Sequence, residues 1–250
     1  MFKFGKNWEN YSDKINKKNI IDSLNDLKFL LRKIPFKKGF SFIDIGCGSG
    51  VHSIAASKLG FKVTSTDRDK ICVKTTKRNY IKFHNFANNR VFQDNILNSK
   101  ITKKFDIVYS WGVLHHTGNL TKALNQIKKL VKKDGYLIIS LYKKTESDKM
   151  WFYIKKKYNQ KIFFRFIINL FFIPFYYYIS KKKRFYRRGQ DWYHDAIDWL
   201  GGFPYETIDP DKMKYYFKDL KLIFVSRKKP MKYKGFFGSE CAEYIFKKNR

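Results

Sequence analysis

The sequence predicts an α/β protein with a doubly wound, mostly parallel sheet, and three observations support this fold class. From Phe40 to Tyr142, short apolar runs alternate with stretches of helical periodicity, which is the rhythm of βαβ units. The rhythm stops over 143–205, which indicates a helical or irregular insertion after the fifth strand. Two late apolar runs are joined by a segment without a helical pattern, which indicates an antiparallel C-terminal hairpin.

The individual elements follow in order along the chain. Residues 7–34 are predicted to be helical, because isoleucine and leucine recur at helical spacing until Pro35 ends the pattern. Strands are expected over the apolar runs 41–46, 61–67, 90–95, 105–112 and 136–142. Helices are expected over 51–60, 68–83 and 119–135, and glycines close the first and the last of them. Asp209 and Pro210 are expected to begin a helix within 208–220, and 221–227 and 241–248 to form the last two strands.

Composition and charge narrow the class of protein. A chain of 250 residues with a net charge of +32 could bind nucleic acid, but lysine (43) far outnumbers arginine (10), and base readout favours arginine. A dedicated nucleic-acid surface is therefore not the favoured interpretation. The three cysteines, Cys47, Cys72 and Cys241, form no close pair, so neither a disulfide framework nor a metal site is expected. Without an apolar signal region near Met1, a cytoplasmic location is expected.

A glycine loop follows the first predicted strand, in "FSFIDIGCGSGVHS". Its glycines are Gly46, Gly48 and Gly50, so the pattern from Asp44 is D-x-G-x-G-x-G. A nicotinamide dinucleotide loop reads G-x-G-x-x-G, and its third glycine would fall at Val51. The spacing therefore disfavours a nicotinamide dinucleotide, and the rest of the chain has to indicate which nucleotide-like ligand the loop would bind.

Several motifs together carry a resemblance to a known family: "IDIGCGSG", "TSTDRD", "FQDN", "FDIVYSWGVLHHTG" and "LVKKDGYLIISLY". With these motifs, the chain resembles the class I S-adenosylmethionine-dependent methyltransferases, of the group that includes ubiquinone-biosynthesis methyltransferases. The resemblance implies a Rossmann-like sheet of seven strands with helices on both faces. It also implies the cofactor S-adenosylmethionine, which would leave as S-adenosylhomocysteine.

The resemblance also assigns cofactor-binding residues at the carboxyl ends of the strands. Asp44 is expected near the methionine part of the cofactor, Asp67 at the ribose hydroxyls, and Asp94 with Asn95 at the adenine amine. The alternative for Asp67 and Asp94 is that they only cap turns or helices. The complete expected set is Asp44, Gly46, Cys47, Gly48, Gly50, Asp67, Arg68, Asp94, Asn95 and Trp111.

The resemblance divides the chain into four parts. These are an N-terminal helical cap (1–39), a cofactor-binding α/β core (40–142), an acceptor-capping insertion (143–205) and the completion of the core (206–250). Within the insertion, 162–179 is apolar and aromatic and is followed by basic residues. It is either a lid helix over the acceptor or an interfacial helix, in which case 162–184 would contact an anionic membrane.

Acceptor and proton-transfer residues are expected in two places. His115 and His116 follow the fourth strand, and "YRRGQDWYHDAIDWLGGFPYE" (186–206) mixes polar and aromatic residues without clear periodicity. The candidates for proton transfer are His116 and His194, because histidine titrates near neutral pH. The candidates for acceptor binding are His115, Arg187, Arg188, Tyr193, Asp195 and Asp198.

The sequence thus predicts methyl transfer from S-adenosylmethionine to a small-molecule acceptor. A hydroxyl oxygen on an aromatic, sugar or lipid-linked compound is the favoured acceptor. RNA (tRNA) or protein methylation, using the basic surface, is the alternative. A non-catalytic S-adenosylmethionine-binding or membrane-associated protein is the third interpretation.

Overall fold

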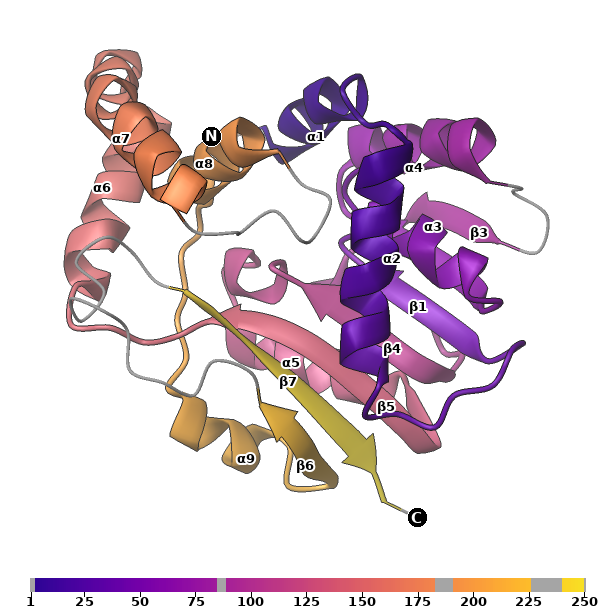
Figure 1. Ribbon diagram of the computed structural model, residues 1–250. Coiled ribbons are helices and arrows are strands. Elements are labelled where there is room, and N and C mark those ends of the chain that lie inside the picture. The colour runs from indigo at the N-terminus through magenta and orange to yellow at the C-terminus, as the bar shows by residue number, and fades with distance from the viewer. Residues whose placement is uncertain (1–2, 85–88, 183–190, 226–239, 250) are drawn as a thin grey trace.

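The computed structural model describes residues 3–84, 89–182, 191–225 and 240–249. Its centre is a sheet of seven strands in the order β3-β2-β1-β4-β5-β7-β6 (Figure 1). Strands β1 to β5 are parallel, β7 is antiparallel to β5, and β6 is antiparallel to β7. The strands are β1 (Ser41–Ile45), β2 (Lys62–Asp67), β3 (Arg90–Gln93), β4 (Phe105–Trp111), β5 (Val131–Tyr142), β6 (Leu220–Val225) and β7 (Cys241–Lys248). The predicted mixed sheet with its antiparallel C-terminal pair is confirmed.

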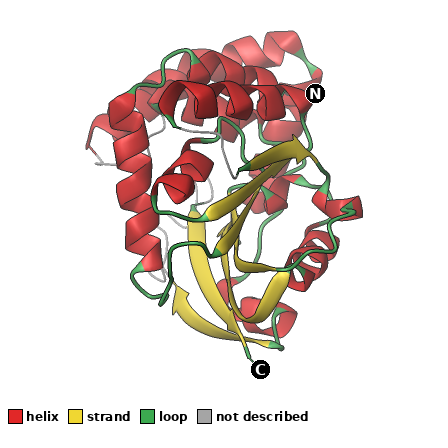
Figure 2. Ribbon diagram, turned by 90° about the vertical axis from the view of Figure 1, so that its right-hand side faces the viewer, coloured by secondary structure: helices red, strands yellow, loops and turns green. Residues whose placement is uncertain are grey.

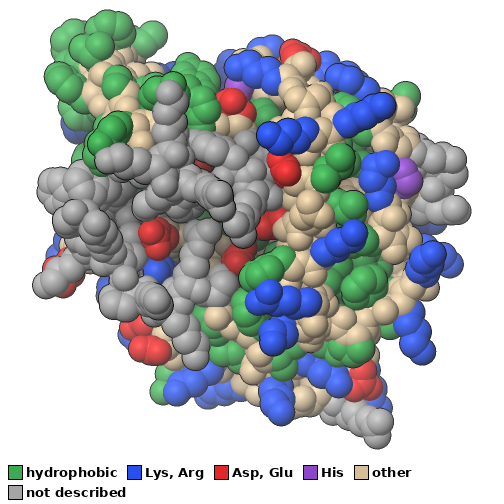
Figure 3. Space-filling model, viewed as in Figure 1, with side chains coloured by type: hydrophobic (Ala, Val, Ile, Leu, Met, Phe, Trp, Pro, Cys, Tyr) green, Lys and Arg blue, Asp and Glu red, His purple; other side chains and the backbone are tan. Residues whose placement is uncertain are grey.

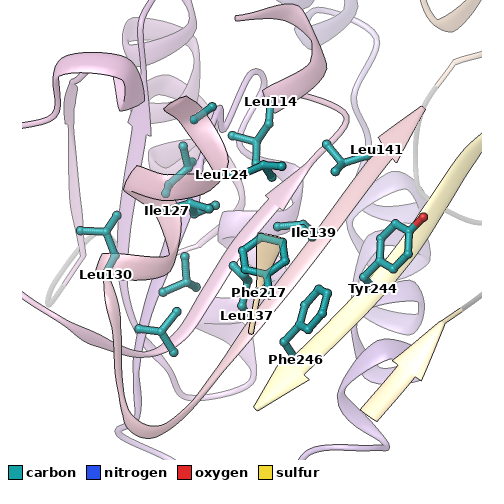
Figure 4. Packing of buried hydrophobic residues seen from close by; sticks show 14 of the residues in the cluster. Leu114, Leu124, Ile127, Leu130, Leu137, Ile139, Leu141, Phe217, Tyr244 and Phe246 are labelled. Carbon is teal, nitrogen blue, oxygen red and sulfur yellow. The ribbon is translucent and has the colours of Figure 1, made fainter. Parts of the chain in front are cut away.

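Helices cover both faces of the sheet (Figures 1 and 2). On one face, α2 and α3 pack on Phe42, Ile107 and Ile138. On the other, α5 and α9 pack on a second apolar cluster that includes Ile43 and Ile139 (Figure 4). The helices are α1 (Phe4–Ser12), α2 (Lys17–Leu31), α3 (Val51–Lys58), α4 (Lys70–Phe83), α5 (Leu120–Lys129), α6 (Asp148–Gln160), α7 (Ile162–Lys182), α8 (Trp192–Gly201) and α9 (Met213–Tyr216).

Alternation along the strands explains the two clusters. Successive side chains of a strand point to opposite faces, so Phe42 and Ile43 enter different clusters although both are fully buried. A sheet that is covered on both faces needs continuous apolar runs, and "SFIDI" is buried at every position. This burial fixes the ends of the strands, where the polar loops begin.

The structure corrects three local predictions. The N-terminal segment is two helices and not one, because Asn16 forms a capping box with Asn19 and starts α2. Helix α5 ends at Lys129, whereas the pattern predicted a helix to Gly135; Val131 instead pairs with Phe105 and opens β5.

The third correction concerns 186–206, whose described part contains the regular helix α8. Asp191 caps this helix by accepting hydrogen bonds from the backbone N–H groups of Tyr193 and His194. The expected cap at Asp209 is confirmed, since its side chain accepts from the N–H of Asp211 next to Pro210.

The insertion after β5 forms a hairpin of α6 and α7, which α8 follows (Figure 1). The insertion has a separate apolar cluster, in which Trp151, Tyr158 and Leu200 are buried. The partly buried Phe172 and Trp199 pack against this cluster. In the described part of the chain, no helix has both the length and the apolar character needed to cross a membrane.

Candidate active site

A cavity of about 320 Å³ lies at the carboxyl ends of the parallel strands. Asp44 and Ile45 reach it from the end of β1, Asp67 from β2, and Trp111 from β4. The crevice beyond the carboxyl ends of the strands is where open α/β sheets bind ligands. The remaining wall comes from the glycine loop, from Phe4 and Trp8 of α1, and from the segment around α8.

The glycine loop forms one side of the cavity, and its backbone geometry depends on glycine at Gly46. The N–H of Gly46 donates to the carbonyl of Thr66 at 2.8 Å, and its φ of +80° lies in the left-handed region. A Cβ added here would stand 2.4 Å from Cγ2 of Val113, far inside contact distance. Gly112, next to Val113 in the chain, has a φ of +72° and would place a Cβ in open space. At Gly112 the cavity therefore runs up to bare backbone, whereas at Gly46 the side chain of Val113 packs against the backbone.

Most charged side chains on the wall of the cavity are acidic. Asp44, Asp67 and Asp94 lie at or just after the carboxyl ends of β1, β2 and β3, and Asp69 and Asp198 also line the cavity. Among the described residues that line the cavity, Arg68 is the one lysine or arginine. The interior therefore favours a cation and opposes a pyrophosphate, although the chain as a whole carries +32.

Asp67 is held by the loop that it faces. Its two carboxylate oxygens accept from the N–H of Gly48 at 3.0 Å and from the N–H of Asp69 at 2.9 Å. Each oxygen keeps a further lone pair for a ligand hydroxyl. Burial raises the pKa of Asp67 above its usual range, and the two backbone donors oppose that rise.

Asp44 is the most deeply buried of these carboxylates. It is 3% exposed and accepts from the Ser53 hydroxyl at 2.5 Å, while the Ser65 hydroxyl donates to that of Ser53. Burial raises the pKa of Asp44 to about 7, and the neighbouring negative charge of Asp67 adds to the rise. Asp44 therefore titrates near neutral pH, where a bound cation would favour its ionised form.

Helix α1 covers the glycine loop, which sequence reasoning did not assign. The N–H of Gly5 donates to Oδ2 of Asp69 at 3.1 Å, and Asp69 is also the N-cap of α4. This docking places Phe4 and Trp8 on the cavity wall. Their i, i+4 spacing in "FGKNW" puts both rings on one face of a helix, and this was the available signal.

His115 and His116 are adjacent in the chain but have opposite tautomers. Nδ1 of His115 accepts from the N–H of Tyr142 at 3.3 Å, so its proton is on Nε2. Nδ1 of His116 donates to the carbonyl of Pro204 at 2.8 Å, so its lone pair is on Nε2. His116 lines the cavity and His115 does not. Burial lowers the pKa of His116 to about 3, which keeps its ring neutral.

A buried lysine lies behind this end of the cavity without lining it. Lys155 of α6 is fully buried, donates to the carbonyl of Trp199, and lies 4.0 Å from the centroid of the Trp199 ring. Its burial lowers its pKa to about 7, and the charge of Asp198 opposes this. Burial raises the pKa of Asp198 to about 7, and Lys155 holds it down. Oδ1 of Asp198 and Nε2 of His116 are buried without a hydrogen-bond partner in the described part of the chain.

Lys155 was not predicted from the sequence, although a signal was present. Trp151, Lys155 and Tyr158 follow i, i+4, i+7 spacing on the buried face of α6, so a lysine stands in an apolar stripe. A charge at such a position needs a buried partner, which here is the carbonyl of Trp199, and the charge of Asp198 also favours the charged lysine.

Three further predicted acceptor and proton-transfer residues lie outside the cavity wall: Tyr193, His194 and Asp195. Nδ1 of His194 is 2.7 Å from Oδ1 of Asp191, and Oδ2 of Asp195 accepts from the hydroxyl of Tyr176. Tyr193 is exposed. Arg187 and Arg188 lie outside the described residues. Among the predicted residues of this kind that the structure describes, Asp198 and His116 line the cavity, and the roles of the whole group stay predictions.

Most of the expected cofactor residues lie together. Asp44, Gly46, Cys47, Gly48, Asp67, Arg68, Asp94, Asn95 and Trp111 all line the cavity. Gly50 does not; it is the N-cap of α3. The Asn95 side chain also caps a short 3₁₀ turn by accepting from the N–H of Leu97. Within the described ranges, no three histidine, cysteine or acidic side chains converge as a metal site.

Comparisons with known proteins point to one family. A family model described as "Methyltransferase domain" matches residues 16–171. Ribosomal protein L11 methyltransferase of Campylobacter concisus is 35% identical over 123 residues, which are 48% of this chain and 40% of that protein. Ubiquinone biosynthesis O-methyltransferase of Pelagibacter ubique is 30% identical over 129 residues, 52% of this chain and 51% of that protein. The chain thus spans about half the length of these curated relatives or less.

Solved structures share the fold at low identity. Magnesium protoporphyrin IX methyltransferase of Synechocystis, crystallised with S-adenosylhomocysteine, gives a TM-score of 0.58 at 13% identity and covers 94% of this chain and 89% of that chain. TehB of Haemophilus influenzae gives 0.55 at 15% identity, covering 90% of this chain and 62% of that chain.

Proposed function

The chain belongs to the methyltransferase-domain family, and on this premise we propose that it moves a methyl group from S-adenosylmethionine to a hydroxyl oxygen of a small-molecule acceptor. The acceptor class is an aromatic, sugar or lipid-linked compound. One observation supports the proposal. A single cavity is lined both by the glycine loop with its acidic neighbours and by Asp198 and His116, whose Oδ1 and Nε2 atoms are buried proton acceptors. Membership of the narrower ubiquinone-biosynthesis group stays a prediction.

The residues present fit the cofactor. S-adenosylmethionine, when bound, supplies a methyl group on a cationic sulfonium that an oxygen nucleophile can displace. The acidic wall suits that cation, and the bare backbone at Gly112 leaves space that a Cβ would fill. Asp67 would hold the ribose hydroxyls, Asp94 the adenine amine, and Asp44 would face the cationic part. These assignments rest on the family resemblance and on the placement of the three carboxylates.

At the acceptor end, Asp198 is the group best suited to take the hydroxyl proton. It lines the cavity, its Oδ1 has no partner among the described residues, and its pKa of about 7 matches a base that works near neutral pH. His116 would orient the hydroxyl through its Nε2 lone pair; its pKa of about 3 makes it the weaker base. His194, the other predicted base, does not reach the cavity wall.

The cover over the cavity supports a small acceptor. Phe4 and Trp8 of α1 close one side, and Phe203 and Pro204 close another. Aromatic walls with a few polar groups are typical of small-molecule sites. An acceptor hydroxyl must pass beneath this cover to reach Asp198, and alignment in such a site is a large part of the catalytic gain.

The test is a transfer assay with radiolabelled S-adenosylmethionine and a panel of acceptors. The panel holds a catechol, a prenylated phenol, a sugar, bulk tRNA and a recombinant ribosomal protein L11. We expect label in one of the first three, and its loss in Asp198→Asn. The matched control is Asp219→Asn, whose carboxylate is exposed and lies outside the cavity wall. Label in none of the small acceptors but in tRNA or L11 would refute the acceptor class.

Protein methylation is the second candidate, because relatives named as ribosomal protein L11 methyltransferases are 33–38% identical over part of the chain. A protein substrate would have to insert an extended side chain beneath α1 and α8. Label in L11 that survives Asp198→Asn would favour this candidate, because an uncharged amine needs no such base at high pH. RNA methylation would show a steep loss of activity with salt.

A further inference from the structure

An exposed apolar face runs along α7, and no described part of the chain covers it. Ile162, Phe163 and Phe171 are 84%, 72% and 72% exposed. The exposed residues recur every three or four positions: Ile162, Phe163, Phe166, Leu170, Phe171 and Pro174. That spacing places them on one side of a helix. We call this side the outer face of α7.

The opposite side of α7 is already used for packing. Phe172 stacks on Trp199 with ring centroids 5.2 Å apart and meets Trp151 edge-on at 6.0 Å. Asn169 accepts from the hydroxyl of Tyr158 at 3.0 Å. The helix is therefore mostly apolar on both sides, apart from Arg165 and Asn169, and one side holds it to α6 and α8. An exposed apolar side on such a helix indicates contact with a second apolar environment, outside the described part of the protein.

We propose that the outer face of α7 lies in the interfacial layer of an anionic lipid membrane. The charges on the hairpin of α6 and α7 favour an anionic membrane over other partners. Residues 149–182 contain no aspartate or glutamate, and Lys156, Lys157 and Lys161 are exposed on the same hairpin. Basic residues beside aromatic ones are the pattern of interfacial helices. A second copy of the chain would bring another net charge of +32 to the contact, which disfavours self-association.

The place of α7 in the molecule suits this contact. The hairpin of α6 and α7 stands out from the body at one end of the sheet (Figure 1). In the space-filling view, hydrophobic side chains gather at that same corner (Figure 3). The helix does not meet the requirements for spanning a bilayer, so the contact is interfacial. This proposal does not rest on the proposed function, because it concerns a surface away from the cavity.

Vesicle flotation of the full chain, without cofactor or acceptor, tests the proposal. The vesicles are pure phosphatidylcholine in one arm and a mixture with phosphatidylglycerol in the other. We expect the protein to float with the anionic vesicles and much less with the neutral ones, and salt to weaken the binding. The variant Phe163→Gln, Phe166→Gln, Phe171→Gln should reduce the partition by roughly tenfold or more, because buried apolar area sets interfacial affinity.

The matched control replaces three exposed apolar residues on other helices: Ile21→Gln, Ile81→Gln and Tyr215→Gln. It should bind like the unmodified chain, and circular dichroism should show the same thermal unfolding for both variants. A second variant, Lys156→Glu with Lys157→Glu, should weaken binding to anionic vesicles alone. Three results would overturn the proposal: no flotation at low salt, unchanged flotation of the phenylalanine variant, or a solution dimer that this variant dissociates.

Discussion

Replacing Gly46 by alanine tests how closely the glycine loop is fitted to its surroundings. Two separate costs follow from the structure. The φ of +80° costs an L-residue roughly 1–2 kcal/mol. The new Cβ would also stand 2.4, 2.5 and 2.9 Å from three atoms of Val113, and overpacking of this kind costs about 1–3 kcal/mol. We therefore expect Gly46→Ala to lower the free energy of unfolding by about 2–5 kcal/mol, the sum of these ranges.

A double-mutant cycle separates these two costs. Val113→Ala removes Cγ1 and Cγ2, the two atoms nearest to the new Cβ, keeps the Cβ of residue 113, and leaves the backbone angle of Gly46 unchanged. The double variant should regain most of the steric part, so the coupling free energy should approach about 1–3 kcal/mol. Urea unfolding measures stability, and titration with S-adenosylmethionine measures the cavity, which both residues line. A loss below about 0.5 kcal/mol in Gly46→Ala, or additive effects in the cycle, would refute the steric argument.

Three further predictions concern the carboxylates and Lys155. Turnover should rise with pH through about 7, because the raised pKa of Asp198 keeps its carboxyl group protonated below that pH. The variant Asp198→Asn should lower kcat by roughly 100-fold or more with little change in cofactor affinity. A flat pH profile would contradict this prediction. Lys155 lowers the pKa of Asp198, so Lys155→Met should move the rising limb to higher pH, and an unmoved limb would show that the two groups are not coupled in catalysis. The affinity for cationic S-adenosylmethionine relative to neutral S-adenosylhomocysteine should increase as Asp44 ionises near pH 7, and calorimetric titration measures both affinities. The variant Asp44→Asn should remove that increase. Equal pH dependence of the two affinities would exclude a charge contact between Asp44 and the cofactor.

The core of the fold was predictable because each strand and helix has a sequence pattern that is recognisable without the rest of the chain. Buried strands read as short apolar runs, and the glycine loop follows the first of them directly. Parallel strands then bring Asp44, Asp67 and Asp94 to one edge, whatever the lengths of the helices between them. This is why most of the expected cofactor residues line a single cavity.

The cover over the cavity was harder to predict because it depends on contacts between distant segments. Gly5 and Asp69 are 64 positions apart, and the i, i+4 spacing in "FGKNW" indicates an aromatic face on α1 but not that this face lies on the glycine loop. Lys155 meets Trp199 across 44 positions, and its burial is decided by the packing of α6 on α8. Helix α8 itself was missed because its polar and aromatic residues hide the periodicity, although Asp191 gave a capping signal.

The opposite tautomers of His115 and His116 give this protein a pair of built-in spectroscopic probes. An unprotonated imidazole nitrogen resonates far from a protonated one in a ¹⁵N spectrum, so the two rings should give mirror-image patterns at Nδ1 and Nε2. The backbone groups of Tyr142 and Pro204 set these patterns. Because only His116 lines the cavity, an entering acceptor should perturb its signals alone. His115 would then serve as an internal reference within the same sample.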